Sequence, residues 1–291
     1  MTFLQPGSWQ EALAARAAHP EAVAVAGGTD VLVDLNFHRL RPAAVLDLGR
    51  VRELCDRSRS DGIVRLGAGV TYHDVIAGLR ADLPGLAMAA RTVGSPQIRN
   101  RGTVGGNLGS ASPAGDAHPP LLACGADVEV ESVRERRRIP AGDFFLGPKR
   151  SALEPDELIA AVHVPPATGP QLFAKVGTRN AMVIAVCSLA IALHPDRRAV
   201  GTGIGSAGPV PLRASEAERF LEGALDAGNL WETRGRLDAS TVSRFAELVG
   251  QAAQPIDDVR GSARYRVHAL RVLARRMIGW AWEEYGRVAR S

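Results

Sequence analysis

Pro165, Pro166 and Pro170 lie close together and divide this chain into two parts with different patterns. Proline has no backbone N–H and restricts the residue before it, so such a cluster ends regular secondary structure. The segment from Val162 to Gly169 is therefore predicted to be a linker. The chain has 291 residues, which suits two domains. We expect a boundary at this linker.

Helix and strand patterns alternate before the linker, which is typical of α/β units, whereas strands precede helices after it, which indicates an α+β domain. In the first part we expect strands over 21–26, 44–48, 62–70 and 127–131, and helices over 8–18, 31–35, 71–79 and 86–92. In the second part we expect strands over 173–176, 183–193 and 198–206, then helices over 212–225, 240–249 and 262–285.

Composition excludes several classes of protein. Hydrophobic residues make up 46% and charged residues 23% of the chain, which is typical of a globular protein and not of a disordered or membrane-embedded one. The net charge is only +4 and aromatic residues are 5%, which disfavours a nucleic-acid binder. The arginine-rich run 134–138 is accordingly interpreted as a solvated hairpin tip. The N-terminus lacks the basic start and apolar run of a signal peptide.

Cysteine and histidine are placed so that no metal site is predicted. The three cysteines, Cys55, Cys124 and Cys187, are isolated, which excludes a zinc ribbon or an iron–sulfur cluster held by this chain alone. Isolated thiols fit a reducing cytosol, so we expect a cytoplasmic protein. The seven histidines have no metal-ligand spacing. We also find no acid–base pair or nucleophile, and therefore predict no catalytic side chain.

Two glycine-rich sequences are rejected as nucleotide sites. Gly203 to Gly208 matches the GxGxxG pattern, but Pro209 and Pro211 prevent the helix that a dinucleotide fingerprint requires. It is interpreted as a strand end and turn. Gly142 to Lys149 resembles a P-loop, but Pro148 breaks the pattern.

Two other glycine-rich segments are candidate anion loops. Residues 26–30 follow a predicted strand, and residues 103–107 lie in a polar stretch, 99–107, that we expect to be a loop. Paired glycines let backbone N–H groups approach an anion, and two such loops suit a diphosphate. Asp30 is expected to cap the following helix with its side chain. Both segments are equally compatible with simple tight turns. Residues 110–116, with Ser112 and Asp116, suit either sugar hydroxyls or an Asx turn.

These segments together resemble the FAD-binding subunit of the molybdenum hydroxylases, a family that includes xanthine dehydrogenase and carbon monoxide dehydrogenase. The resemblance covers nearly the whole chain in the same order, and the second loop is its most specific element. It is carried by residues 26–30, 99–108, 112–116, 145–147, 153–159, 173–181 and 258–266.

The resemblance implies an overall α+β architecture. An FAD-binding domain of the vanillyl-alcohol-oxidase (PCMH) type would cover residues 1–168, made of two α/β subdomains over about 1–57 and 58–168. A C-terminal α+β domain like that of the carbon monoxide dehydrogenase flavoprotein would cover 171–291. The run 178–186 and the sequence Gly205 to Pro209 look most like bacterial xanthine dehydrogenase flavin subunits.

The resemblance also implies a non-covalent FAD site. The two loops would bind the pyrophosphate, Asp116 the sugar hydroxyls, and the 153–158 segment would pack beside the ring. Lys175 would lie near the flavin and tune it. The implied cofactor-binding residues are Val25, Ala26, Gly27, Gly28, Thr29, Asp30, Val31, Leu32, Thr103, Val104, Gly105, Gly106, Asn107, Ser112, Asp116, Leu153, Leu158 and Lys175. Gly105→Val is expected to abolish FAD retention and leave a folded protein.

The chemistry implied is electron relay within a heterotrimer. A molybdopterin-binding large subunit would oxidise the substrate, and an iron–sulfur small subunit would pass electrons to the FAD of this chain, which delivers them to an acceptor. NAD, oxygen and a quinone all stay open as that acceptor. Two alternatives are a stand-alone FAD-dependent oxidoreductase and a flavin-free scaffold that docks the other subunits. Flavin content and co-purification with an iron–sulfur partner discriminate among the three.

Overall fold

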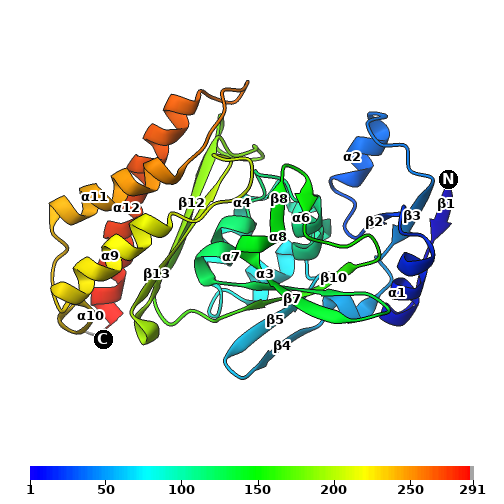
Figure 1. Ribbon diagram of the computed structural model, residues 1–291, viewed down its shortest axis with the longest axis horizontal. Helices are drawn as coiled ribbons and strands as arrows, with labels where there is room; N and C mark the ends of the chain where they lie inside the picture. The colour runs from blue at the N-terminus through cyan, green and yellow to red at the C-terminus, as the bar shows by residue number, and fades with distance from the viewer. Residues whose placement is uncertain (289–291) are drawn as a thin grey trace.

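The computed structural model describes residues 1–288 and shows three layered units in a row (Figure 1). A small unit with the N-terminus lies at one end, a five-stranded sheet with its helices lies in the middle, and a three-stranded sheet covered by long helices lies at the other end. Strands precede helices after the proline cluster, as predicted, and helix and strand alternate as predicted over residues 2–47. The alternation predicted for the rest of the first part is wrong, because two strands over 57–67 are followed by five successive helices over 72–124.

The N-terminal unit is a three-stranded parallel sheet with strand order β1-β3-β2. Its elements are β1 (Thr2–Leu4), α1 (Trp9–Ala18), β2 (Val23–Val25), α2 (Val31–Asn36) and β3 (Ala44–Asp47). Helix α1 begins where predicted, since the Ser8 side chain accepts a hydrogen bond from the Glu11 N–H. The predicted buried strand 21–26 is shorter and more exposed than expected, because β2 is an edge strand and β3 takes the central, buried place.

The middle unit is built on an antiparallel sheet with order β4-β5-β10-β6-β7. Its strands and 3-10 helix are η1 (Arg52–Cys55), β4 (Arg57–Ser60), β5 (Ile63–Gly67), β6 (Asp127–Glu131), β7 (Arg136–Pro140), the small pair β8 (Phe145–Gly147) and β9 (Arg150–Ser151), and β10 (Leu158–Val164). Its helices are α3 (Tyr72–Gly78), α4 (Pro84–Thr92), α5 (Pro96–Arg101), α6 (Val104–Ser110), α7 (His118–Cys124) and α8 (Ala141–Phe144).

Two sequence-based expectations are wrong in this unit. The stretch 99–107 is not a loop, because Ser95 and Thr103 each cap a short helix, α5 and α6, with a side-chain oxygen. The linker also begins later than predicted. Strand β10 is buried through Val164, and only Pro165 and Pro166 end it. A proline cannot donate to the sheet ladder, so the strand stops there.

The C-terminal unit is an antiparallel sheet with order β11-β12-β13 and helices on one face (Figure 1). Its elements are β11 (Gln171–Val176), β12 (Cys187–His194), η2 (Pro195–Arg197), β13 (Ala199–Gly205), α9 (Ser215–Ala227), α10 (Leu230–Thr233), α11 (Ala239–Ala252) and α12 (Ala263–Val288). Strand β12 begins later than the predicted 183–193. The last three residues of the predicted domain, 289–291, lie outside the described residues.

Helix α7 of the middle unit packs on the other face of this sheet, and glycines make that contact possible. A Cβ at Gly203 would lie 2.0 Å from the Pro119 carbonyl oxygen, and one at Gly201 would lie 1.8 Å from that of Ala123. Gly203, the first glycine of the GxGxxG pattern, and Gly201 before it therefore serve close helix–strand packing. The pattern itself covers the end of β13 and the turn after it, in agreement with the prediction. Among the helices described, none combines the length and the apolar run needed to cross a membrane.

Candidate functional site

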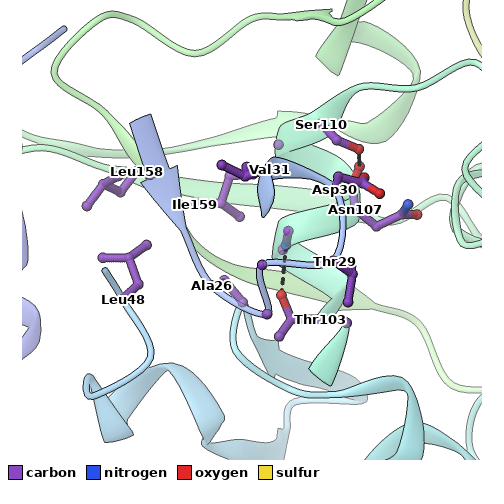
Figure 2. Close-up of a pocket in the computed structure, with 18 of the residues that line it drawn as sticks. Ala26, Thr29, Asp30, Val31, Leu48, Thr103, Asn107, Ser110, Leu158 and Ile159 are labelled. Atoms are coloured by element: carbon purple, nitrogen blue, oxygen red, sulfur yellow. Dashed lines mark hydrogen bonds between the residues drawn. The ribbon is translucent and has the colours of Figure 1, made fainter. Parts of the chain in front are cut away.

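A cavity of about 590 Å³ lies between the N-terminal unit and the middle unit. This size is typical of small-molecule and cofactor sites. Figure 2 shows the chain segment around Ala26 to Val31 together with Thr103, Asn107 and Ser110. Twelve of the predicted cofactor residues line the cavity: Ala26, Gly27, Gly28, Thr29, Asp30, Val31, Thr103, Gly105, Gly106, Asn107, Leu153 and Leu158.

The 26–30 loop lines this cavity, and its backbone N–H groups are free in the described chain. Throughout residues 1–288, none of the five N–H groups of this loop donates a hydrogen bond to a protein acceptor. Gly28 has φ +76°, a conformation that favours glycine. Gly27 lies so close to the next segment that a Cβ would meet the Arg101 carbonyl oxygen at 1.9 Å. Two glycines thus hold a run of unpaired donors against the cavity, which is what an anionic group requires.

The second segment contributes in a different way from that predicted. The first N–H groups of α6 are already bonded: Val104 donates to Val70, Gly105 to Ala68, and Gly106 to the Thr103 hydroxyl at 2.9 Å. The segment 103–107 is therefore a capped helix start and not a loop of unpaired donors. Gly106, which is exposed, gives the wall a surface without a side chain.

Gly105 lines the cavity and is also required by the fold. A Cβ at this position would meet the Ala68 side chain at 2.4 Å and its carbonyl oxygen at 2.7 Å. The expectation that Gly105→Val leaves a folded protein is therefore wrong, because the added side chain collides with the backbone beside β5. Gly106 offers the cleaner substitution, since a Cβ there would approach only the Thr103 hydroxyl, at 2.9 Å.

Asp30 does not cap α2 with its side chain, contrary to the prediction. It occupies the N-cap position with φ −101° and ψ −51°, an αR conformation rather than the extended one of most N-caps, and its carboxylate makes no capping hydrogen bond in the described chain. Asp30 instead lines the cavity.

Six predicted residues do not line the cavity as the structure describes it: Val25, Leu32, Val104, Ser112, Asp116 and Lys175. The last two pair with each other. Lys175 Nζ lies 2.5 Å from Asp116 Oδ2 and also donates to the carbonyl oxygens of Thr92 and Val183. Burial raises the pKa of Asp116 above its usual value, and the ammonium of Lys175 opposes this effect. The pair joins β11 to the segment before α7, and both residues also bond to Thr92 at the end of α4.

Several lining residues are not predicted from the sequence, among them Arg16, Tyr72, Ser110, Glu157 and Ile159. Glu157 and Ile159 fall within the 153–159 segment that carries the family resemblance, and Ser110 falls in the small-residue stretch 110–116, so a signal exists for these three. Arg16 and Tyr72 have none, since they reach the cavity only through the packing of α1 and α3.

Polar groups in the lining fit a cofactor of mixed polarity. In the described chain, the Tyr72 hydroxyl, Asn107 Oδ1 and Arg16 Nε are buried and lack a hydrogen-bond partner. Burial raises the pKa of Tyr72 well above its usual value, so its hydroxyl stays neutral. Apolar side chains such as Leu48, Leu158 and Ile159 line the same space (Figure 2). Unpaired amides, unsatisfied polar side chains and apolar walls together suit a dinucleotide such as FAD.

Residues 1–167 match the family model of the FAD-binding domain in molybdopterin dehydrogenases. Residues 173–281 match the C-terminal domain of the carbon monoxide dehydrogenase flavoprotein. The chain belongs to the FAD-binding subunits of the molybdenum hydroxylases. Its predicted family and α+β fold class are thereby confirmed.

Relatives of this family cover most of the chain. The xanthine dehydrogenase FAD-binding subunit of Escherichia coli O157:H7 is 31% identical over 273 residues, covering 90% of this chain and 89% of the relative. The nicotine 6-hydroxylase medium subunit of Paenarthrobacter nicotinovorans is 32% identical over 284 residues, covering 95% of both chains.

A solved structure extends the match to three dimensions. Carbon monoxide dehydrogenase from Hydrogenophaga pseudoflava superposes with a TM-score of 0.88 at 27% identity, covering 98% of both chains. The chain is thus an oxidoreductase subunit with an FAD-binding domain.

Proposed function

We propose that this chain carries FAD non-covalently in the cavity between its first two units and passes electrons within a heterotrimeric molybdenum hydroxylase. The observation that carries this proposal is that residues 26–30, which line a cavity of about 590 Å³, have five backbone N–H groups in a row that are unpaired within residues 1–288. A diphosphate is the anion that such a row binds well. The proposed cofactor residues are those predicted from the sequence, together with Arg16, Tyr72 and Ser110.

The chain's own residues would bind and orient the cofactor. The 26–30 amides would hold the diphosphate, and the side-chain-free surface at Gly106 would let it approach α6. Leu158 and Ile159 would exclude water from an apolar ring. Bound FAD supplies the chemistry, since it accepts electrons singly and delivers them in pairs.

The partners proposed are a molybdopterin-binding large subunit and an iron–sulfur small subunit. Several relatives have names that mark them as medium subunits or chains, and this chain offers no cysteine cluster of its own. We propose NAD as acceptor, with oxygen and a quinone as the alternatives, and a cytoplasmic location. Relatives of similar identity are named for xanthine, nicotine and carbon monoxide. Substrate choice is therefore assigned to the large subunit, with xanthine the first substrate to test.

The domain division proposed is 1–168 and 171–291, with subdomains over about 1–57 and 58–168. The hydrophobic residues form two clusters: one fills the first two units and reaches Phe173, Ala190 and Ala192 on the near face of the C-terminal sheet, and the other fills the space between that sheet and its own helices. Two separate cores support two domains.

The first test is a visible absorbance spectrum of the purified chain, followed by acid release and mass identification of any cofactor. We expect a flavin spectrum and released FAD. A colourless protein that also fails to bind added FAD would overturn the proposal. Co-purification with an iron–sulfur protein then separates the relay subunit from a stand-alone oxidoreductase.

A further inference from the structure

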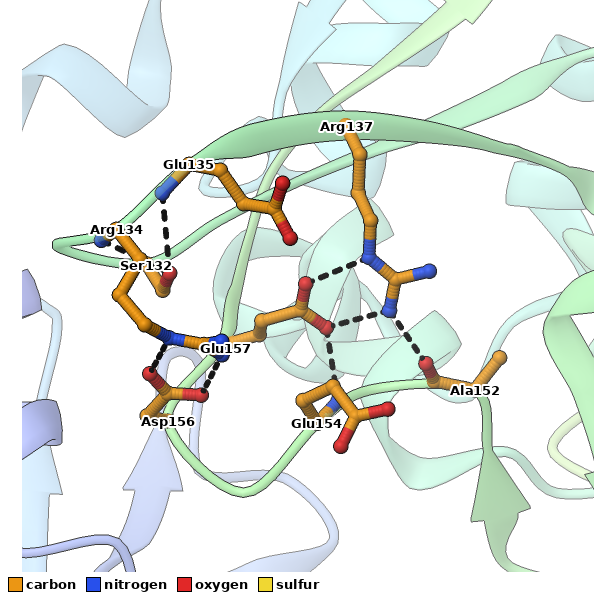
Figure 3. A network of polar contacts seen from close by, with 8 residues as sticks. All are labelled: Ser132, Arg134, Glu135, Arg137, Ala152, Glu154, Asp156 and Glu157. Carbon is orange, nitrogen blue, oxygen red and sulfur yellow. Dashed lines mark hydrogen bonds and ion pairs between the residues drawn. The ribbon is translucent and has the colours of Figure 1, made fainter.

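A network of charged side chains holds the 152–157 loop, which connects β9 to β10, against the β6–β7 hairpin (Figure 3). Arg137 of β7 forms a two-pronged pair with Glu157: Nε lies 2.7 Å from Oε1, and Nη2 lies 2.8 Å from Oε2. Nη2 also donates to the Ala152 carbonyl oxygen at 3.0 Å. Glu157 Oε2 accepts the Glu154 N–H at 2.8 Å. One guanidinium thus binds both ends of the loop.

Glu157 is also a wall residue of the cofactor cavity, which makes its charge matter. Its side chain is 1% exposed, so water does not screen it. Burial raises the pKa of Glu157, but the hydrogen bonds from Arg137 and from the Glu154 N–H outweigh that effect and hold the pKa below its usual value. The carboxylate is therefore ionised near neutral pH. Without a counter-charge, it would place a buried negative charge in the wall of a site for an anionic diphosphate.

We propose that Arg137 is a positioning residue of the cofactor site: it neutralises Glu157 and thereby makes this wall of the cavity compatible with an anionic dinucleotide. The inference rests on the assignment of the cavity to FAD. Arg137 acts through Glu157, because it does not itself line the cavity in the described chain. The same pair fixes the loop that carries Leu153 and leads into β10 at Leu158, both of which line the cavity.

The hairpin supplies its own control. Arg134 binds Asp156 of the same loop with the same two-pronged geometry, at 2.8 Å and 2.7 Å. This pair is solvated, with side-chain exposures of 58% and 22%, and neither residue lines the cavity formed by the described residues. A pair at the surface contributes little. Arg134→Met and Arg137→Met therefore each remove one guanidinium that binds the 152–157 loop, and only the second leaves an unpaired charge at the cavity wall.

The experiment measures the FAD dissociation constant of the apo form of the full chain by fluorescence titration, with a thermal unfolding curve for each variant. We expect Arg137→Met to weaken FAD binding about tenfold or more, which corresponds to about 1.4 kcal/mol. We expect Arg134→Met to stay within about threefold of the wild type. Arg137→Met/Glu157→Gln should recover most of the loss, because the wall is neutral again.

The double variant decides between charge and structure. A double variant as weak as Arg137→Met would overturn the proposal, as would an equal loss in Arg134→Met. If Arg137→Met does not fold, Arg137→Lys takes its place. Lysine keeps the positive charge but cannot form the two-pronged pair with Glu157. The FAD dissociation constant of Arg137→Lys should therefore stay within about threefold of the wild-type value, and a tenfold increase would contradict the proposal. A wild-type chain that binds no FAD would instead refute the proposed function. FAD binding unaffected by a bulky side chain at position 106 would refute the cavity assignment.

Discussion

At the scale of single residues, Gly106 is where a side chain would close the cofactor cavity at least cost to the fold. It is exposed, and it lies in α6 with only the Thr103 hydroxyl near its Cβ direction. Gly106→Val should raise the FAD dissociation constant at least tenfold. The matched control is Gly223→Val, in the exposed face of α9 with open space around it. Valine has a higher helix propensity than glycine, so α6 and α9 should both still form and both variants should fold. Unchanged FAD binding in Gly106→Val would contradict the site.

Because His118 is buried, we expect the stability of the fold to depend on pH. His118 is 0% exposed, its Nε2–H donates to the Asn107 carbonyl oxygen, and burial lowers its pKa to about 4. The unfolded chain, with a histidine pKa of about 6.5, binds more protons in this range. The stability from His118 is therefore complete above about pH 6.5 and is lost as pH falls towards 4.

Between pH 7 and pH 5, this loss amounts to about 2 kcal/mol of unfolding free energy. His118→Gln keeps an N–H donor for Asn107 and removes the titration, so its urea-unfolding free energy should change less over this range. The smaller contribution of His194, whose pKa burial also lowers, stays in both proteins. An identical pH slope in wild type and variant would refute the assignment.

At the scale of elements, the start of α6 depends on one hydroxyl. Thr103 Oγ1 accepts the Gly106 N–H, and without it a helix whose second and third residues are glycine loses its cap. Thr103→Val should lower the unfolding free energy by about 1 kcal/mol and weaken FAD binding, while Thr103→Ser should match the wild type. Chemical unfolding and FAD titration of the two variants check this. Equal behaviour of Val and Ser would exclude the cap as the cause.

The same element shows why the sequence predicts the site better than its structure. Paired glycines between polar residues are a turn signal, so the sequence predicts a loop over 99–107. Helix α6 forms because Thr103 caps it and because Gly105 must lie against Ala68, a contact that no local pattern shows. The 26–30 loop is predicted correctly because it lies directly between a strand and a helix, so that its conformation depends mainly on Gly27 and Gly28. Packing against neighbouring residues thus determines the conformation of 99–107, whereas the glycines of the segment itself mainly determine that of 26–30.

At the scale of the whole molecule, the order of strands and helices is readable from periodicity, but contacts between units are not. Arg137 belongs to a basic run whose pattern indicates a solvated tip. That interpretation holds for Arg134, which is largely exposed, and fails for Arg137, whose partner is buried Glu157. Lys175 and Asp116, some sixty positions apart, meet because β11 packs on α4 and α7, and Asp116 lies just before α7. Long-range pairs of this kind carry no signal in a single sequence.

The Lys175–Asp116 pair yields the last prediction, since it ties the C-terminal sheet to the middle unit. The Lys175 side chain is 10% exposed and the Asp116 side chain 9%. Lys175→Met should lower the unfolding free energy by about 3–5 kcal/mol, because it leaves the Asp116 carboxylate buried and unpaired. Lys175→Met/Asp116→Asn should recover most of this loss. Urea unfolding at pH 7 measures both effects.

The double variant also separates two roles of this pair. If the pair serves only the fold, the double variant should regain both stability and FAD binding. If Lys175 and Asp116 also touch the cofactor, as the family resemblance implies, stability should return while the FAD dissociation constant stays raised at least tenfold. If Lys175→Met is as stable as the wild type, the pair contributes nothing to joining the two units. An unpaired carboxylate that is buried this deeply destabilises the fold, unless the surrounding packing opens and lets water reach it.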